Sequence, residues 1–246
     1  MADVSRETPP LPPDPAVLSA LVSTERLPLL DRYAALLTTE GVLRGLIGPR
    51  EVPRLWDRHL VNCALMASLV PDRARLADLG SGAGLPGLVL AIVRPDLAVT
   101  LIEPMARRTA FLDEAVASLG LEQVEVVRGR AEDWDRSERF DVVTARALAP
   151  LPKLLRWALP LVEPGGAVLA MKGSSAADEI EAATAELQRA RAIAEVLHPE
   201  VAGATPTTVV RVVPQIGTAI GWPSEGERRT GTATRRPARR GRKGPR

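Results

Sequence analysis

Short apolar runs alternate with helical segments from residue 74 onward, and this alternation limits the fold more than any other feature of the sequence. The runs are rich in Val, Ile and Leu at successive positions, which is typical of strands in a sheet covered on both faces. The predicted strands span residues 74–80, 98–103, 124–129, 140–146, 166–173 and 207–214. The predicted helices between them span residues 85–93, 106–119, 151–160 and 175–193. Such alternation predicts an α/β fold built on a doubly wound, mostly parallel sheet.

The segments on either side of this region have other compositions. Residues 1–15 contain five prolines and little to bury, so we expect a disordered lead-in. Residues 16–72 carry apolar side chains at helical spacing, which predicts an N-terminal helical cap or helices that only enlarge the core. Residues 73–218 form the expected α/β domain, and residues 219–246 form an expected disordered basic tail.

Charge is distributed unevenly along the chain. The 32 Lys and Arg residues against 30 Asp and Glu residues give a net charge of +2. Residues 228–246 hold nine basic residues and no acidic one, so residues 1–227 carry 32 − 9 = 23 basic against 30 acidic residues, a charge of −7. Charge alone therefore indicates a nucleic-acid partner only through the tail. The tail is expected either to add phosphate contacts to RNA or to serve only solubility.

Several classes of site and location are disfavoured by composition. The lone Cys63 excludes an intramolecular disulfide and a cysteine-based zinc cluster, and two histidines give no support for a metal site. Seven aromatic residues argue against a base-stacking platform. The N-terminus lacks the pattern of a signal peptide, and the longest apolar stretch, residues 60–70, is about half a membrane span. We expect a soluble, cytoplasmic, monomeric protein without a membrane partner.

A glycine-rich segment, DLGSGAGLPG at residues 78–87, follows the first predicted strand. Glycines there let the backbone adopt positive φ and let a ligand approach the main chain. The helix that follows is expected to direct free N–H groups at that ligand. Glu103 ends the next strand, where a carboxylate can accept both ribose hydroxyls of a nucleoside. The segment therefore predicts a nucleoside-cofactor site, the alternative being a tight turn without a ligand.

Two cofactors compete for this loop. The spacing G-x-G-x-x-G from Gly82, with Glu103 21 residues later, satisfies the dinucleotide fingerprint of NAD enzymes. The spacing D-x-G-x-G-x-G from Asp78 resembles the first motif of S-adenosylmethionine-dependent methyltransferases. Asp78 favours the methyltransferase, because an acid beside the loop repels a pyrophosphate but accepts from an amino-acid ammonium directly or through water. Residues 130–134, RAEDW, follow the third strand, where methyltransferases hold the adenine edge.

Five segments together narrow the resemblance to one family. They are RLWDRHLVNC (54–63), DLGSGAGLPGLVLAI (78–92), RAEDW (130–134), FDVVTARALAPL (140–151) and PGGAVLAMKG (164–173). In this order they resemble the RsmG (GidB) family, which methylates N7 of a guanine in bacterial 16S ribosomal RNA. The resemblance covers about residues 20–215, and its most specific part is TARA-x-APL after the fourth strand. It implies a seven-stranded, Rossmann-like class I methyltransferase acting on 16S ribosomal RNA or the small subunit.

The resemblance also assigns residues to the cofactor site. Gly80 and Leu85 match loop positions, Ala131 and Glu132 match the pair that holds the adenosine, and Arg146 matches an arginine at the end of the fourth strand. Together with the two residues argued from the loop itself, the expected S-adenosylmethionine-binding residues are Gly80, Gly82, Leu85, Glu103, Ala131, Glu132 and Arg146. Leu85 and Leu88 replace other apolar residues often seen there, and the basic tail is not part of the family pattern.

The expected chemistry needs no general base, because guanine N7 has a lone pair and no proton to lose; positioning and electrostatics suffice. Arg146 is the candidate for positioning, at the carboxyl end of a central strand. Its structural alternative is an ion pair with Asp141 or Glu132. Cys63 is predicted on a helix before the first strand, as a buried small residue rather than a nucleophile.

Three residues are candidates for RNA contact. Lys172 ends the fifth strand and is expected to meet a phosphate or to be a solvated strand end. Arg58 and His59 are expected to contact RNA or to form interhelical hydrogen bonds. Three functions remain open: a 16S guanine-N7 methyltransferase, a methyltransferase of the same fold acting on a protein or small molecule, and an NAD enzyme or nucleotide-binding module.

Overall fold

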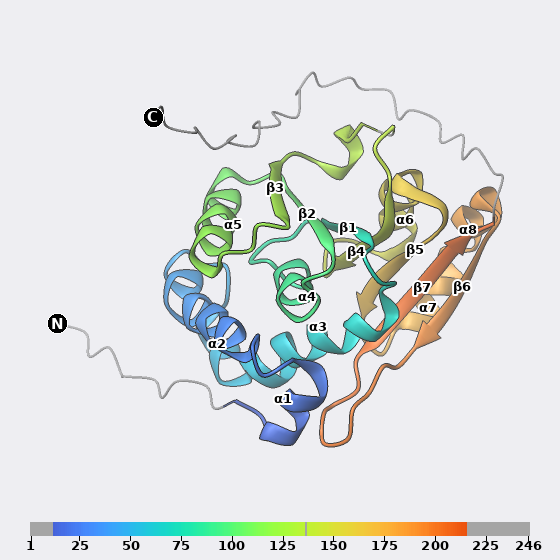
Figure 1. Ribbon diagram of the computed structural model, residues 1–246. Coiled ribbons are helices and arrows are strands. Elements are labelled where there is room, and N and C mark those ends of the chain that lie inside the picture. Colours follow the sequence, from blue (N-terminus) through green and yellow to red (C-terminus); the bar gives the residue numbers. More distant parts are fainter. Residues whose placement is uncertain (1–11, 136, 216–246) are drawn as a thin grey trace, which may run out of the picture.

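A seven-stranded sheet forms the centre of the computed structural model, which describes residues 12–135 and 137–215. Most of the predicted lead-in and the whole predicted basic tail lie outside these residues. The strands are β1 (Arg75–Leu79), β2 (Ala98–Glu103), β3 (Val124–Arg128), β4 (Phe140–Arg146), β5 (Val162–Lys172), β6 (Ala192–Leu197) and β7 (Thr208–Pro214). Their order is β3-β2-β1-β4-β5-β7-β6; β7 runs antiparallel to both β5 and β6, and the other pairs are parallel. The predicted doubly wound, mostly parallel α/β fold is confirmed (Figure 1).

Two boundaries differ from the sequence prediction. The prediction of one helix over residues 175–193 is wrong at its end. The segment forms two helices, α7 (Ala176–Ala182) and α8 (Thr184–Ala190), and β6 already begins at Ala192. α8 ends at Arg191, whose backbone is in the left-handed region at φ 46°. The following strand, β6, is mostly half-exposed at the edge of the sheet, so its sequence lacks the continuous apolar run by which the other strands were predicted. β5 begins at Val162 rather than Gly166, with an irregular register opposite Phe140 and Val142.

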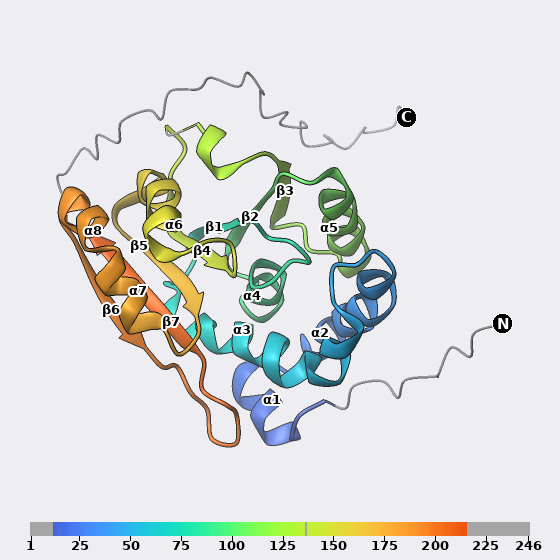
Figure 2. The same ribbon diagram turned by 180° about the vertical axis from the view of Figure 1, so that it is seen from behind.

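Helices cover both faces of the sheet (Figures 1 and 2). The N-terminal helices pack on one face with α4 (Gly87–Val93) and α5 (Ala106–Leu119). α6 (Leu151–Ala158), α7 and α8 pack on the other. Side chains along β1 alternate between the two hydrophobic clusters, Leu76 in the first and Ala77 and Leu79 in the second. Burial on both faces explains why the central strands are apolar at successive positions.

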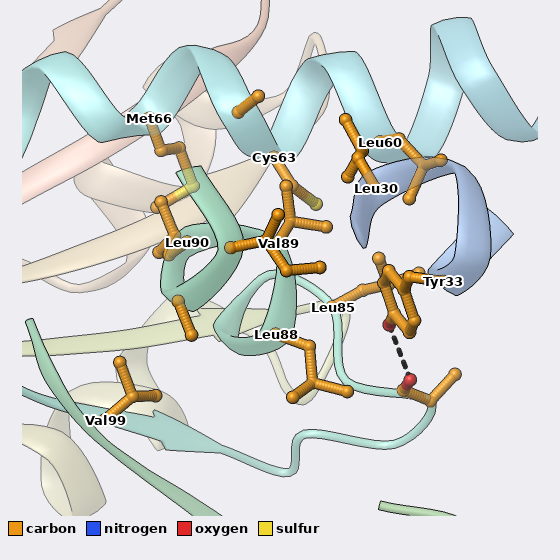
Figure 3. Packing of buried hydrophobic residues seen from close by; sticks show 14 of the residues in the cluster. Leu30, Tyr33, Leu60, Cys63, Met66, Leu85, Leu88, Val89, Leu90 and Val99 are labelled. Carbon is orange, nitrogen blue, oxygen red and sulfur yellow. Dashed lines mark hydrogen bonds between the residues drawn. The ribbon is translucent and has the colours of Figure 1, made fainter. Parts of the chain in front are cut away.

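The N-terminal region consists of short helical segments of several kinds. They are α1 (Pro15–Leu21), α2 (Leu27–Leu36), a π-helix (Leu37–Gly41), a 3₁₀ helix (Pro49–Arg54), a second π-helix (Leu55–Val61), α3 (Asn62–Leu65) and a second 3₁₀ helix (Met66–Leu69). Figure 3 shows Tyr33, Leu60 and Met66 of this region packed around side chains of α4. The region therefore shares one hydrophobic cluster with the α/β domain.

The carboxyl ends of β1 and β4 lie side by side near the middle of the sheet. From this point β2 continues in one direction and β5 in the other, which is the switch point where doubly wound sheets bind ligands. Among the described residues, no helix is long and apolar enough to cross a membrane.

Candidate functional site

The loop after β1 has the backbone that its glycines predict. Gly80, Gly82 and Gly84 have φ of 67°, 59° and 98°, which side chains rarely allow. At Gly84 a Cβ would also lie 2.5 Å from Leu88 Cδ1 and 2.8 Å from the Tyr33 hydroxyl. Gly84 is therefore required for two reasons, the positive φ of the turn and the close packing of Leu88 and Tyr33 against its backbone.

Tyr33 of α2 fixes the position of the loop through a hydrogen bond. Its buried hydroxyl donates a hydrogen bond of 2.7 Å to the backbone oxygen of Ala83 (dashed line in Figure 3). Burial raises the pKa of Tyr33 well above its usual value, so it stays a donor. This contact was not predicted, because a tyrosine among apolar side chains at helical spacing in residues 16–72 is indistinguishable from any other core residue.

Most N–H groups of the loop donate hydrogen bonds to acceptors within the protein. For these groups the prediction of free N–H donors facing a ligand is wrong. Gly80 and Ser81 donate to Ile102 O at 2.8 and 3.3 Å, and Gly82 donates to Glu103 Oε2 at 3.0 Å. The remaining bonds run from Gly84 and Leu85 to Ser81 O and from Gly87 to Asp78 Oδ2. A pyrophosphate needs such donors free, so this arrangement disfavours NAD.

Two buried carboxylates lie behind the loop instead. Asp78 is 0% exposed and Glu103 is 1% exposed. Burial raises the pKa of Asp78 to about 7, and its Oδ1 has no hydrogen-bond partner among the described residues. Glu103 accepts from Gly82 N through Oε2 and from Met105 N through Oε1, and Oε2 also lies 3.5 Å from the Arg108 guanidinium, so the lone pair that remains for a ligand is on Oε1. A ligand with hydroxyl or ammonium donors suits these acids.

Two cavities open above the carboxyl ends of the strands. The first, of about 380 Å³, is lined by loop residues 80–83 and Leu85, with Arg108 of α5 and His59 of the N-terminal helical region. The second, of about 930 Å³, extends to Lys172 and Glu179. Residues 146–148 line both, and both volumes are typical of small-molecule sites. Ala147 in this shared wall is in the left-handed region at φ 50°, a strained conformation common at functional sites.

Arg146 is the charged residue of the shared wall. Its guanidinium donates to His59 Nδ1, to Arg58 O at 3.3 Å and to Cys63 Sγ at 3.7 Å. Within the described residues no carboxylate lies within ion-pair distance of it, so the alternative of a pair with Asp141 or Glu132 is wrong. An arginine without a carboxylate on a cavity wall is available to an acceptor of a ligand.

His59 links Arg146 to Glu51. Its Nε2 lies 2.9 Å from Glu51 Oε2, while Nδ1 faces the Arg146 guanidinium. Arginine can only donate, so Nδ1 must accept and the proton must sit on Nε2, where it is donated to Glu51. Burial, and then the charge of Arg146, lower the pKa of His59. A neutral His59 thus orients Arg146.

We expect His59 to titrate below its usual value near pH 6.5, and Glu51→Gln to lower that pKa further because it removes a carboxylate that favours the imidazolium. Two-dimensional NMR of the imidazole protons checks this, with His198→Gln for assignment and Asp57→Asn as an exposed control. Since the unfolded chain takes up this proton first, stability should fall as pH drops below about 6.5. A His59 pKa that is higher in E51Q than in the parent would contradict the assigned contact between Glu51 and His59.

Lys172 is not a solvated strand end, and that alternative is wrong. Its side chain is 9% exposed, and Nζ donates to Ala149 O at 2.9 Å and to Glu179 Oε2 at 2.6 Å. Glu179 Oε2 also accepts from Leu151 N, at the start of α6. Glu179 was not predicted, since its only signal in the sequence is its position seven residues after Lys172 on the next helix.

The remaining residues singled out in the sequence line neither cavity. Ala131 and Glu132 belong to a 3₁₀ turn (Ala131–Asp133) after β3 and are outside the residues that line the two cavities. Cys63 is buried on α3 as predicted, and burial raises its thiol pKa to about 11, which makes it a poor nucleophile. In the described ranges no group of three or more His, Cys, Asp or Glu residues is placed to hold a metal ion.

Comparison with known proteins places these features in one family. The chain matches GidB, rRNA small subunit methyltransferase G, over residues 26–204. It is 57% identical to a ribosomal RNA small subunit methyltransferase G of Nocardioides sp., over 95% of this chain and 93% of the relative. A protein of that name from Thermobifida fusca is 54% identical over 88% and 93%. The solved Trm5b of Pyrococcus abyssi is similar in fold alone, with a TM-score of 0.51 at 13% identity over 69% of this chain and 50% of that one.

Proposed function

The chain belongs to the GidB family, rRNA small subunit methyltransferase G, and we propose that it transfers a methyl group from S-adenosylmethionine to N7 of a guanine in 16S ribosomal RNA. The observation that carries the proposal is the pair of cavities that meet at Arg146. One is bounded by the glycine loop, and the other has room for a base. The proposed substrate places the enzyme in the cytoplasm, with naked rRNA or the small subunit as its partner.

The residues around the first cavity suit S-adenosylmethionine better than a dinucleotide. Two strand-end carboxylates lie behind the loop, outside the cavity lining, and the loop N–H groups of Gly80, Gly82 and Gly84 are already bonded within the protein, whereas a pyrophosphate needs free N–H donors. We assign the cofactor's ribose hydroxyls to Glu103 and its ammonium to Asp78, directly or through water, with Gly80, Gly82 and Leu85 as the wall. We keep Ala131 and Glu132 as the proposed adenosine contacts on the family resemblance. When bound, the cofactor supplies a methyl group on a positively charged sulfur.

The protein's task in this reaction is positioning. Guanine N7 attacks with its own lone pair and loses no proton, so no side chain has to act as a base. This agrees with a site in which His59 is tied to Glu51 and Arg146, and Cys63 is buried. Arg146 is the proposed positioning group, with its fork held by His59 and the Arg58 carbonyl so that its free edge can contact cofactor or base.

The second cavity is the proposed site for the target base. A base can react there only after it leaves its stack, as in other enzymes that modify bases. Arg58 lines this cavity and is half-exposed, so it can meet RNA phosphate beside the base. His59, by contrast, is 9% exposed and is assigned to Arg146 rather than to RNA.

The proposal predicts that the protein labels N7 of one guanine when it is incubated with methyl-labelled S-adenosylmethionine and small subunits lacking their base methylation. Naked 16S rRNA is the parallel substrate. Nuclease digestion and mass spectrometry locate the label, and calorimetry compares binding of S-adenosylmethionine with NAD. Label on ribosomal protein or on another base atom, or tight NAD binding, would refute the proposed function.

A further inference from the structure

The second cavity must do more than hold a purine if the reaction is to be specific. Adenine and guanine both present N7 at the same place on the ring, so contact at N7 alone does not separate them. They differ at positions 1, 2 and 6, where guanine offers N1–H and an N2 amino group as donors and O6 as acceptor. Adenine instead offers an N1 lone pair and a 6-amino group. A protein acceptor opposite N1 and N2, with a donor opposite O6, therefore separates guanine from adenine.

Glu179 and Lys172 are an acceptor and a donor fixed side by side in this cavity. Both hydrogen bonds of the Glu179 side chain, from Lys172 Nζ and Leu151 N, fall on Oε2. Oε1 has no partner within the described part of the chain, and Glu179 lines the cavity. Lys172 Nζ has three N–H donors, of which Glu179 and Ala149 take two. One acceptor oxygen and one donor thus remain for a ligand.

The position of this pair relative to Arg146 fits the shape of guanine. Arg146 on β4 is the register partner of Met171 on β5, and Lys172 is the next residue along that strand. Lys172 and Glu179 line only the second cavity, whereas Arg146 lines both. A purine whose N7 faces the first cavity turns positions 1 and 2 of its six-membered ring away from that cavity, and position 6 lies on the edge between N7 and position 1. That ring would then lie toward the pair.

We propose that Glu179 and Lys172 select guanine, with Glu179 Oε1 accepting from N1–H and the N2 amino group and Lys172 donating to O6. This rests on the proposed function, since it specifies how that site recognises its base. Against adenine, the carboxylate meets the N1 lone pair and the ammonium meets an amino group, so both contacts become repulsive. Methylation at N7 makes the ring cationic and its N1–H a stronger donor, so the Glu179 bond strengthens in the transition state.

The test uses small subunits reconstituted with a single base change at the labelled guanine. Single-turnover rates are measured for guanine, adenine and 1-methylguanine with the parent protein, Glu179→Gln and Asp178→Asn, an exposed residue on the same helix. For the parent we expect 1-methylguanine, which keeps N7 but lacks N1–H, to react at least 100-fold more slowly than guanine. E179Q should lower the guanine rate about ten- to hundred-fold and shrink the guanine-to-adenine ratio at least tenfold, because an amide can donate to adenine N1. D178N should leave the ratio unchanged.

The outcomes separate this inference from the proposed function. A parent protein that does not methylate guanine refutes the function itself. A parent that methylates guanine and 1-methylguanine equally well overturns only the assignment of Glu179, and it does so without any variant. A merely structural Glu179 would lower the melting temperature and slow all bases alike, so equal losses for guanine and adenine also overturn it. The affinity of E179Q for S-adenosylmethionine should match that of the parent, since Glu179 is outside the first cavity.

Discussion

Arg146→Gln is expected to slow methyl transfer about 100-fold, the scale of loss when a reacting group is misplaced by an ångström. The guanidinium is held from two directions, by His59 Nδ1 and by Arg58 O, and it lies where the two cavities meet. Glutamine is too short to keep both contacts while reaching a ligand. Arg146→Lys should be nearly as slow, because an ammonium cannot replace a planar fork that makes several bonds at once.

Single-turnover rates and calorimetry with S-adenosylmethionine measure this prediction. Arg211→Gln is the matched control, since Arg211 pairs with Glu195 on the outer strands and lines neither cavity. That exposed pair contributes at most about 1 kcal/mol to stability. If R146K keeps the full rate, charge alone suffices and the positioning role of the fork is wrong.

His59→Gln tests the same network from its other side. A glutamine carbonyl can still accept from Arg146 but does not titrate, so the variant should keep much of the rate and lose the acid limb of the pH–rate profile. In the parent that limb should lie below about pH 6.5, because the pKa of His59 is lowered by burial. An identical acid limb in parent and variant would assign the titration to another group.

Sequence predicted the parts of the site whose position depends on the local backbone conformation or on the end of a strand. The glycine loop has the positive φ angles that its pattern requires, and Arg146 lies at the end of β4 beside β1. Continuous apolar runs identified the buried strands, and they failed for β6, which is only half covered. These features depend on neighbours in sequence or on burial, and both leave a visible pattern.

The contacts that sequence reasoning missed join distant segments. Tyr33 reaches Ala83 from 50 residues away, and Arg146 reaches His59 from 87 residues away. Periodicity shows which face of a helix is buried but not which atoms it meets, so Tyr33 was indistinguishable from the leucines around it. The free N–H groups expected of the loop were wrong for the same reason, since their acceptors include Ile102 and Glu103 on the next strand.

Gly87→Ala should be among the most destabilising single-methyl additions available in the described residues. A Cβ at Gly87 would lie 2.4 Å from Leu101 Cδ2 and 2.7 Å from Asp78 Oδ2, and both side chains are completely buried. Overpacking of this kind costs about 1–3 kcal/mol or more, which for a domain of this size lowers the melting temperature by roughly 2–4 °C per kcal/mol. The clash also pushes the Asp78 carboxylate out of its bond to the Gly87 N–H.

Thermal unfolding with and without S-adenosylmethionine separates the two consequences of Gly87→Ala. Gly48→Ala is the matched control, because Gly48 has φ of −70° and no atom within 4 Å of an added Cβ, so the change should be neutral or slightly stabilising. In the parent and in G48A the cofactor should raise the melting temperature, since it binds only the folded state. In G87A that rise should be lost, because the loop and the buried acid behind it move together. If S-adenosylmethionine raises the melting temperature of G87A as much as that of the parent, Asp78 does not contribute to cofactor binding and has only a structural role beside the loop.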